Sequence, residues 1–199
     1  MKLYAAATAV LLLACAASGN DSVKGNAFGT PRAPILMEIF SDFACPGCKQ
    51  LHDTELPRLM EDFVKPGKVY LIYRYFPLEM HPYGRRAAEY VCAAAQLGKW
   101  EQAANLLFAR QSIWAQDGKV EETVDTLFPP AEQKQLRELL KAPSVQAEIN
   151  RDIEEGKAVP VTGTPTLLVT YRLHRYPIGG QEPFNYPLVK SFLDDLLKK

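Results

Sequence analysis

The stretch ILMEIFSDFACPGC, residues 35–48, joins a short apolar run to a pair of cysteines. Residues 35–40 are almost wholly apolar, which predicts a strand buried on both faces of a sheet. Cys45 and Cys48 follow after four residues, and residues 49–64 carry apolar side chains at helical spacing. We therefore expect Cys45 at a strand-to-helix junction, with Pro46 in the first helical turn, where its missing N–H is tolerated.

Two cysteines this close can form a structural disulfide, bind a metal or exchange electrons with other thiols. At a helix start, unpaired N–H groups and the helix dipole lower the pKa of Cys45 below the free value of roughly 8.5. Cys48, one turn along, can then resolve a mixed disulfide formed at Cys45. His52 adds only a third metal ligand, and a four-residue disulfide loop gains little entropy. Redox exchange is the favoured interpretation, with an open metal site or a structural disulfide as alternatives.

The rest of the chain predicts further strands and helices. Residues 69–76 and 166–170 read as strands, residues 172–176 continue a hairpin, and residues 185–199 form an amphipathic helix. Glycines and prolines divide a helical block at about 80–158 between the second and third strands. A strand–helix–strand opening favours a parallel pair with a right-handed crossover.

A second motif, Gly163-Thr164-Pro165-Thr166, stands directly before the third strand. Alone it would be read as a turn. If the Thr164–Pro165 peptide bond is cis, this segment can project beside Cys45. Thr164 then offers backbone N–H and C=O groups to an extended substrate.

Residues 38–48 together with residues 163–166 resemble the DsbA-like thiol–disulfide oxidoreductases of the thioredoxin superfamily. The resemblance covers roughly residues 35–197, nearly the whole mature chain. It implies an α/β, thioredoxin-like fold with an inserted helical domain at about 80–158. It also implies that Cys45 is the nucleophile, Cys48 the resolving thiol and Pro165 a cis-proline.

The same resemblance implies substrates that are protein thiols or disulfides, and reoxidation by a membrane partner coupled to quinone. In the best-known DsbA motif a histidine follows the proline, whereas this chain has Gly47 after Pro46. These two residues tune the motif, and Gly47 leaves the direction of electron flow open. A disulfide donor is the first hypothesis. A reductase or isomerase of the same fold is the second, and a non-catalytic metal-binding or structural lipoprotein is the third.

Glu38 lies in the apolar strand, seven residues before the first cysteine. A buried carboxylate beneath the motif has a raised pKa and can relay protons. We therefore predict that Glu38 is a catalytic proton relay. The alternative is that it faces elsewhere and pairs with a basic residue such as Arg74.

The N-terminal segment differs from the rest of the chain. A single lysine and an apolar run within residues 1–17 predict an export signal, too short to be a comfortable transmembrane anchor. Residues 12–15 resemble a lipoprotein signal, so Cys15 becomes a lipidated first residue and a membrane tether, unless ordinary cleavage removes it. Residues 18–34 read as a tether. Either route predicts a periplasmic or other extracytoplasmic location, where disulfides persist.

Composition excludes some other classes. Lys+Arg and Asp+Glu each number 23, and no block of like charge predicts a nucleic-acid surface. We expect no organic cofactor and no metal. Cys92 falls on the apolar face of an alanine-rich helix, which predicts a buried core thiol.

Overall fold

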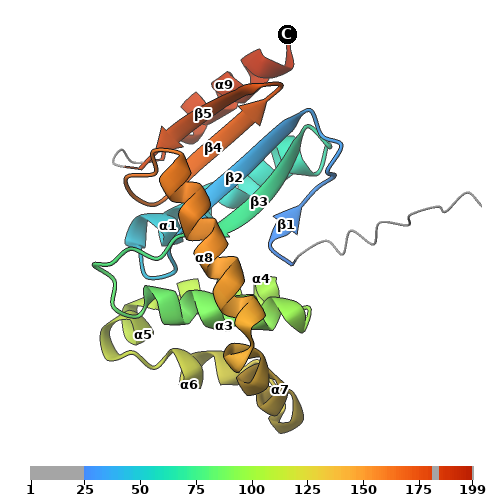
Figure 1. Ribbon diagram of the computed structural model, residues 1–199. Helices are drawn as coiled ribbons and strands as arrows, with labels where there is room; N and C mark the ends of the chain where they lie inside the picture. The colour runs from blue at the N-terminus through green and yellow to red at the C-terminus, as the bar shows by residue number, and fades with distance from the viewer. Residues whose placement is uncertain (1–24, 181–183, 199) are drawn as a thin grey trace, which may run out of the picture.

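A computed structural model of the chain describes residues 25–180 and 184–198. A five-stranded sheet in the order β1-β3-β2-β4-β5 forms its centre (Figure 1). Strand β2 pairs parallel with β3, and the other pairs are antiparallel. The strands are β1 (Ala27–Phe28), β2 (Ile35–Ser41), β3 (Val69–Tyr75), β4 (Thr166–Tyr171) and β5 (His174–Gly179).

Strand β2 is central, and its apolar sequence follows from burial on both faces. Alternate side chains of a strand point to opposite faces. Phe40 packs against Val159 and Leu168 on one face. Ile39 belongs to the main core, which also contains Cys48. Met37 and Ile39, which flank Glu38 in β2, therefore lie on the same face of the sheet as the cysteine motif. The Glu38 side chain points to the opposite face.

The crossover from β2 to β3 is a helical segment interrupted by wider turns. It consists of α1 (Pro46–Gln50), η1 (Leu51–Glu55), α2 (Leu56–Leu59) and η2 (Met60–Val64), where η1 and η2 are π-helical turns. Pro57 lies at the start of α2 and has no N–H to donate. The N–H of Leu56 reaches back to the Leu51 carbonyl, as a π-helical turn requires.

The helical insertion lies between β3 and β4, below the sheet in Figure 1. Glycines mark ends of helices in this block: Gly98 follows the helix Gly84–Gln96 and Gly118 follows the helix Gln111–Asp117, both with positive φ. Helix α8 then crosses the sheet towards β4. The helices are α3 (Gly84–Gln96), α4 (Trp100–Ala109), α5 (Gln111–Asp117), α6 (Val120–Asp125), α7 (Pro130–Lys141) and α8 (Pro143–Ala158).

The C-terminal helix α9 (Tyr186–Leu197) begins at Asn185, whose side chain accepts a hydrogen bond from the Leu188 N–H at 3.2 Å. The Tyr186 hydroxyl bonds to the Arg58 carbonyl at 3.3 Å. Helix α9 thus packs beside α2, as the amphipathic pattern of its sequence requires.

Two sequence-based expectations need correction. Residues 27–28, assigned to a tether, form β1, which pairs with β3 at Ile72 and Leu71. A two-residue strand has no periodicity that a sequence pattern could reveal. The hairpin strand extends to Gly179, beyond the predicted residue 176. The expected export signal and Cys15 lie outside the described residues, and within residues 25–180 and 184–198 no helix is long and apolar enough to cross a bilayer.

Candidate active site

Cys45 lies at the junction of β2 and α1, as predicted. It is the N-cap of α1 with extended backbone angles (φ −80°, ψ 123°), and Pro46 occupies the first turn. The Cys45 carbonyl accepts a hydrogen bond from the Lys49 N–H at 3.1 Å. The Cys45 N–H donates to the Asp42 carbonyl at 3.1 Å. The start of the helix thus holds the Cys45 sulfur beside the first N–H groups of α1.

The surroundings of Cys45 stabilise a thiolate. Its pKa is lowered to about 5, chiefly by the hydrogen bond with Cys48 and further by Thr164 and by the N–H groups of Cys48 and Gly47, while partial burial opposes the shift. In its protonated form the Cys45 thiol donates to the Thr164 carbonyl at 3.3 Å. The buried Thr164 hydroxyl has no hydrogen-bond partner within the described residues, so it can donate to the thiolate.

Cys48 differs from Cys45 in its environment. Its side chain has no solvent exposure, and burial raises the pKa of Cys48 well above the ordinary value. The Asp42 N–H donates to its sulfur at 3.4 Å. The two thiols, both reduced here, therefore form an unequal pair in which Cys45 carries the negative charge.

The proline loop meets the cysteine motif in space. The Thr164–Pro165 peptide bond is cis, the geometry implied by the family resemblance. A Cβ atom added to Gly47 would lie 3.3 Å from Pro165 Cδ and 3.7 Å from Cys45 Sγ. Gly47 thus faces the proline directly, and a larger residue here would enter the space between Cys45 and Pro165.

Two supports of the motif were not identified from the sequence. The amide of Gln111, from α5, donates to the carbonyls of Phe43 (2.7 Å) and Cys45 (3.0 Å). The buried carboxylate of Asp42 contacts the His81 ring at 2.6 Å. Neither contact has a sequence signal, because the partners lie far apart in the chain.

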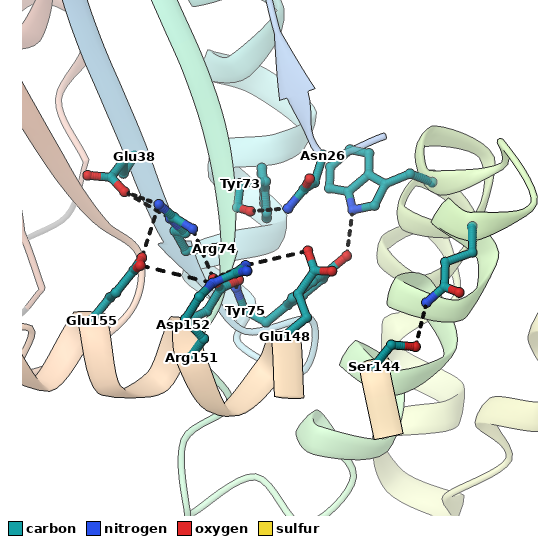
Figure 2. A network of polar contacts seen from close by, with 12 residues as sticks. Asn26, Glu38, Tyr73, Arg74, Tyr75, Ser144, Glu148, Arg151, Asp152 and Glu155 are labelled. Carbon is teal, nitrogen blue, oxygen red and sulfur yellow. Dashed lines mark hydrogen bonds and ion pairs between the residues drawn. The ribbon is translucent and has the colours of Figure 1, made fainter. Parts of the chain in front are cut away.

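The structure favours the alternative interpretation of Glu38. Its carboxylate accepts hydrogen bonds from the Arg74 guanidinium at 2.6 and 2.8 Å (Figure 2). Asp152 and Glu155 of α8 contact the same guanidinium, at 3.0 Å each. Glu38 therefore belongs to a charge cluster between the sheet and α8, on the face opposite Cys48, and not to the space beneath the motif.

The remaining candidates lie in packed surroundings. Cys92 is buried within α3. The His52 ring packs against Phe108, with centroids 4.5 Å apart, and its Nε2 contacts the Asn105 amide at 2.8 Å. Within the described part of the chain no group of three or more His, Cys, Asp or Glu side chains is arranged to bind a metal.

Comparison with known proteins places this arrangement in context. The sequence profile of the family described as Thioredoxin matches residues 21–194. The Na(+)/H(+) antiporter NhaA 3 of Salinispora tropica is 31% identical over 163 residues, which are 79% of this chain but 23% of that protein. The probable disulfide bond formation protein D of Bacillus anthracis is 25% identical over 180 residues, covering 86% of this chain and 77% of that protein.

Among solved structures, α-DsbA1 of Wolbachia pipientis superimposes with a TM-score of 0.72 at 18% identity, covering 87% of this chain and 90% of that one. The likeness at this identity concerns the fold, and it confirms the expected thioredoxin-like architecture with a helical insertion. Since the family match takes in both the cysteine motif and the cis-proline loop, the chain belongs to the thioredoxin family.

Proposed function

We propose that this protein, a thiol–disulfide oxidoreductase of the DsbA type, donates a Cys45–Cys48 disulfide to thiols of exported proteins. The observation that carries the proposal is the contrast between the two sulfurs. The pKa of Cys45 is lowered to about 5, and Cys48 is fully buried. A thiolate stabilised at Cys45 favours the reduced form of the protein, and hence the release of its disulfide to a substrate.

The reaction proceeds by two exchanges. A substrate thiolate attacks Cys45 Sγ, the Cys45–Cys48 bond breaks, and its electron pair leaves on Cys48. A second substrate thiolate then attacks the substrate sulfur of the mixed disulfide, and Cys45 leaves as a thiolate. The substrate loses two electrons and gains a disulfide, and the protein gains the same two electrons as a dithiol.

Thr164 and Pro165 are the proposed substrate wall. The Thr164 carbonyl is 3.3 Å from the Cys45 sulfur, so a chain attached to that sulfur lies beside this backbone. Main-chain groups grip an extended peptide with little regard to its sequence. This suits an enzyme that acts on many proteins.

The deciding measurement is the equilibrium of the Cys45–Cys48 pair with glutathione. A reduction potential more oxidising than roughly −180 mV supports a donor. A lower potential, towards the roughly −270 mV of thioredoxin, would assign the reductase or isomerase role instead. A protein that binds zinc stoichiometrically and exchanges no disulfide would favour the non-catalytic alternative.

We further propose an extracytoplasmic location and reoxidation by a quinone-linked membrane partner. The apolar N-terminal segment and the likeness of the fold to DsbA proteins support this. Mass spectrometry of the mature N-terminus separates the two routes, since a lipid on Cys15 marks a membrane tether and a shorter N-terminus marks ordinary cleavage.

A further inference from the structure

Two hydroxyl groups lie beneath the buried cysteine. Ser41 ends β2, and its Oγ is 3.0 Å from the hydroxyl of Tyr73 on β3. Both side chains are buried, with exposures of 2% and 0%. Ser41 and Tyr73 lie at odd-numbered positions of β2 and β3, on the face that carries Cys48.

The Cys48 sulfur accepts a hydrogen bond from the loop that follows β2, next to this pair of hydroxyls. The Asp42 N–H points to it at 3.4 Å. The Ser41 hydroxyl, one residue before Asp42, lowers the pKa of Cys48, whereas the larger effect of burial raises it. Burial raises the pKa of Tyr73 above the ordinary range, so its phenol stays protonated and can donate to Ser41. The serine hydrogen is then directed at Cys48.

We propose that Ser41 is a catalytic residue whose hydroxyl, oriented by Tyr73, donates a hydrogen bond to the Cys48 thiolate when that sulfur leaves or attacks. The inference rests on the proposed exchange at Cys45–Cys48 and deepens it. Tyr73 is a positioning residue, since it acts through Ser41. The polar group beneath the motif is thus a hydroxyl in place of the carboxylate predicted at Glu38.

The chemistry requires such donors. When a substrate thiolate attacks Cys45, the bond to Cys48 breaks and its electron pair leaves on Cys48. This sulfur has no exposure to water, and an unsolvated buried charge is costly. Preorganised donors stabilise the charge as it develops, without reorganisation of the site. The same donors favour the thiolate when Cys48 attacks a mixed disulfide at Cys45.

The expected kinetic effect follows from this role. Loss of one hydrogen bond to a charged sulfur raises the pKa of Cys48 by about one to two units. For each unit by which the pKa of Cys48 rises, the fraction of Cys48 that is thiolate falls about tenfold. The nucleophilicity of that thiolate rises about threefold, because the Brønsted coefficient is about 0.4–0.5. Closing of the disulfide therefore slows about three- to fourfold per unit. Cys48 is a neutral thiol in the reduced protein, so the substitution leaves the equilibrium between the disulfide and dithiol forms unchanged. Because that equilibrium is the ratio of the two rates, opening of the Cys45–Cys48 disulfide slows by the same factor as closing.

The test uses glutathione and the variants Ser41→Ala and Tyr73→Phe. One experiment measures the rate at which glutathione opens the oxidised Cys45–Cys48 disulfide. A second measures the rate at which Cys48 resolves a glutathione mixed disulfide at Cys45. We expect Ser41→Ala to slow both rates about three- to tenfold and to change the equilibrium constant less than about twofold. Tyr73→Phe should slow both rates by a smaller factor.

Tyr75→Phe is the matched control. Tyr75 is also a buried tyrosine of β3, but its hydroxyl accepts a hydrogen bond from the Trp100 indole at 3.1 Å. Both rates should stay at the wild-type value in this variant. If a tyrosine substitution changed only the packing of the core, it would alter the stability of the protein without slowing the opening and the closing of the disulfide by the same factor.

The outcomes separate the inference from the function on which it rests. If wild-type protein does not exchange with glutathione, the proposed function fails. If wild-type protein exchanges but Ser41→Ala and Tyr73→Phe keep both rates, only the role of Ser41 is overturned. Slowing in one direction, with a shifted equilibrium, would also overturn it, because Ser41 would then stabilise one redox state and not the thiolate.

Discussion

The Nδ1 atom of His81 lies 2.6 Å from Oδ2 of Asp42, a carboxylate with no solvent exposure. The same carboxylate accepts the N–H groups of Ala44 at 2.8 Å and Leu78 at 2.9 Å. Asp42 therefore ties the loop that carries Cys45 to the segment that leads into the helical insertion. A single buried carboxylate thus holds two segments of the backbone together, one directly before Cys45 and one directly after β3.

Removal of this acid should destabilise the protein. Asp42→Ala leaves the partly buried N–H groups of Ala44 and Leu78 without an acceptor, each at a cost of about 1–3 kcal/mol. We expect the free energy of unfolding in urea to fall by about 3 kcal/mol. His81→Ala should lower it by only about 1 kcal/mol, because both N–H groups keep their acceptor.

His174→Ala provides the control for the histidine, since His174 is exposed on β5. This variant should unfold within about 0.5 kcal/mol of wild type. Equal stability of Asp42→Ala and wild type would contradict a structural role for the acid.

A second prediction concerns the Glu38–Arg74 cluster. Arg74→Met removes the Arg74 cation from the fully buried carboxylate of Asp152, which keeps the Tyr75 N–H and the half-exposed Arg151. We therefore expect a cost of about 2–3 kcal/mol, below the roughly 3–5 kcal/mol of a fully broken buried pair. Arg175 is half-exposed and 3.7 Å from Glu38. Arg175→Met should therefore cost less than about 1 kcal/mol in the same urea titration.

Substitution of Glu38 distinguishes a structural role of this carboxylate from a catalytic one. Because Glu38 lies on the face opposite Cys48, Glu38→Gln should lower stability yet leave the rate of exchange with glutathione at the wild-type value across the pH range. A pH profile shifted by this substitution would restore the proton-relay role predicted from the sequence.

The ambiguity at Glu38 has a physical origin. A strand buried on both faces has no alternation of polar and apolar residues, so its sequence does not reveal which side chains face the motif. The order of strands and helices was predictable because apolar periodicity and glycine or proline breaks are local signals. The contacts of Ser41, Gln111 and His81 depend on residues 32 to 68 positions away, and no local pattern encodes them.

The reactivity of Cys45 should follow its lowered pKa. We expect the rate of alkylation of the reduced protein by iodoacetamide to rise with pH through a midpoint near 5. Cys45→Ser should abolish this phase. A midpoint near the free value of roughly 8.5 would contradict the assigned thiolate.

The lowered pKa also predicts how stability depends on pH. The pKa of Cys45 is lower in the folded protein than in the unfolded chain, so its contribution is complete above the unfolded value and is lost as pH falls towards about 5. In urea titrations between about pH 5 and about pH 8, the stability of the reduced protein relative to Cys45→Ser should therefore increase with pH. A constant difference would contradict the shift.

The Thr164 hydroxyl should tune the oxidising power. Thr164→Val keeps the side-chain shape but removes the buried hydroxyl, one of the groups that, after Cys48, lower the pKa of Cys45. We expect that pKa to rise by about one unit, and the equilibrium with glutathione to shift about tenfold towards the disulfide form of the protein. Thr162→Val, at an exposed position of the same loop, should leave both quantities unchanged.

The division of roles between the cysteines leads to a trapping experiment. In Cys48→Ser, a thiol reagent such as oxidised glutathione still forms a mixed disulfide at Cys45, but no resolving thiol remains. The adduct should therefore accumulate, and mass spectrometry of peptides should place it on Cys45. In Cys45→Ser no adduct should form at Cys48, because that sulfur has no exposure and a raised pKa. Cys92→Ala, which changes a buried thiol of α3, should exchange at the wild-type rate. An adduct on Cys92 or on Cys48 would reverse the assignment, because the attacking sulfur would then be one that the fold keeps from solvent.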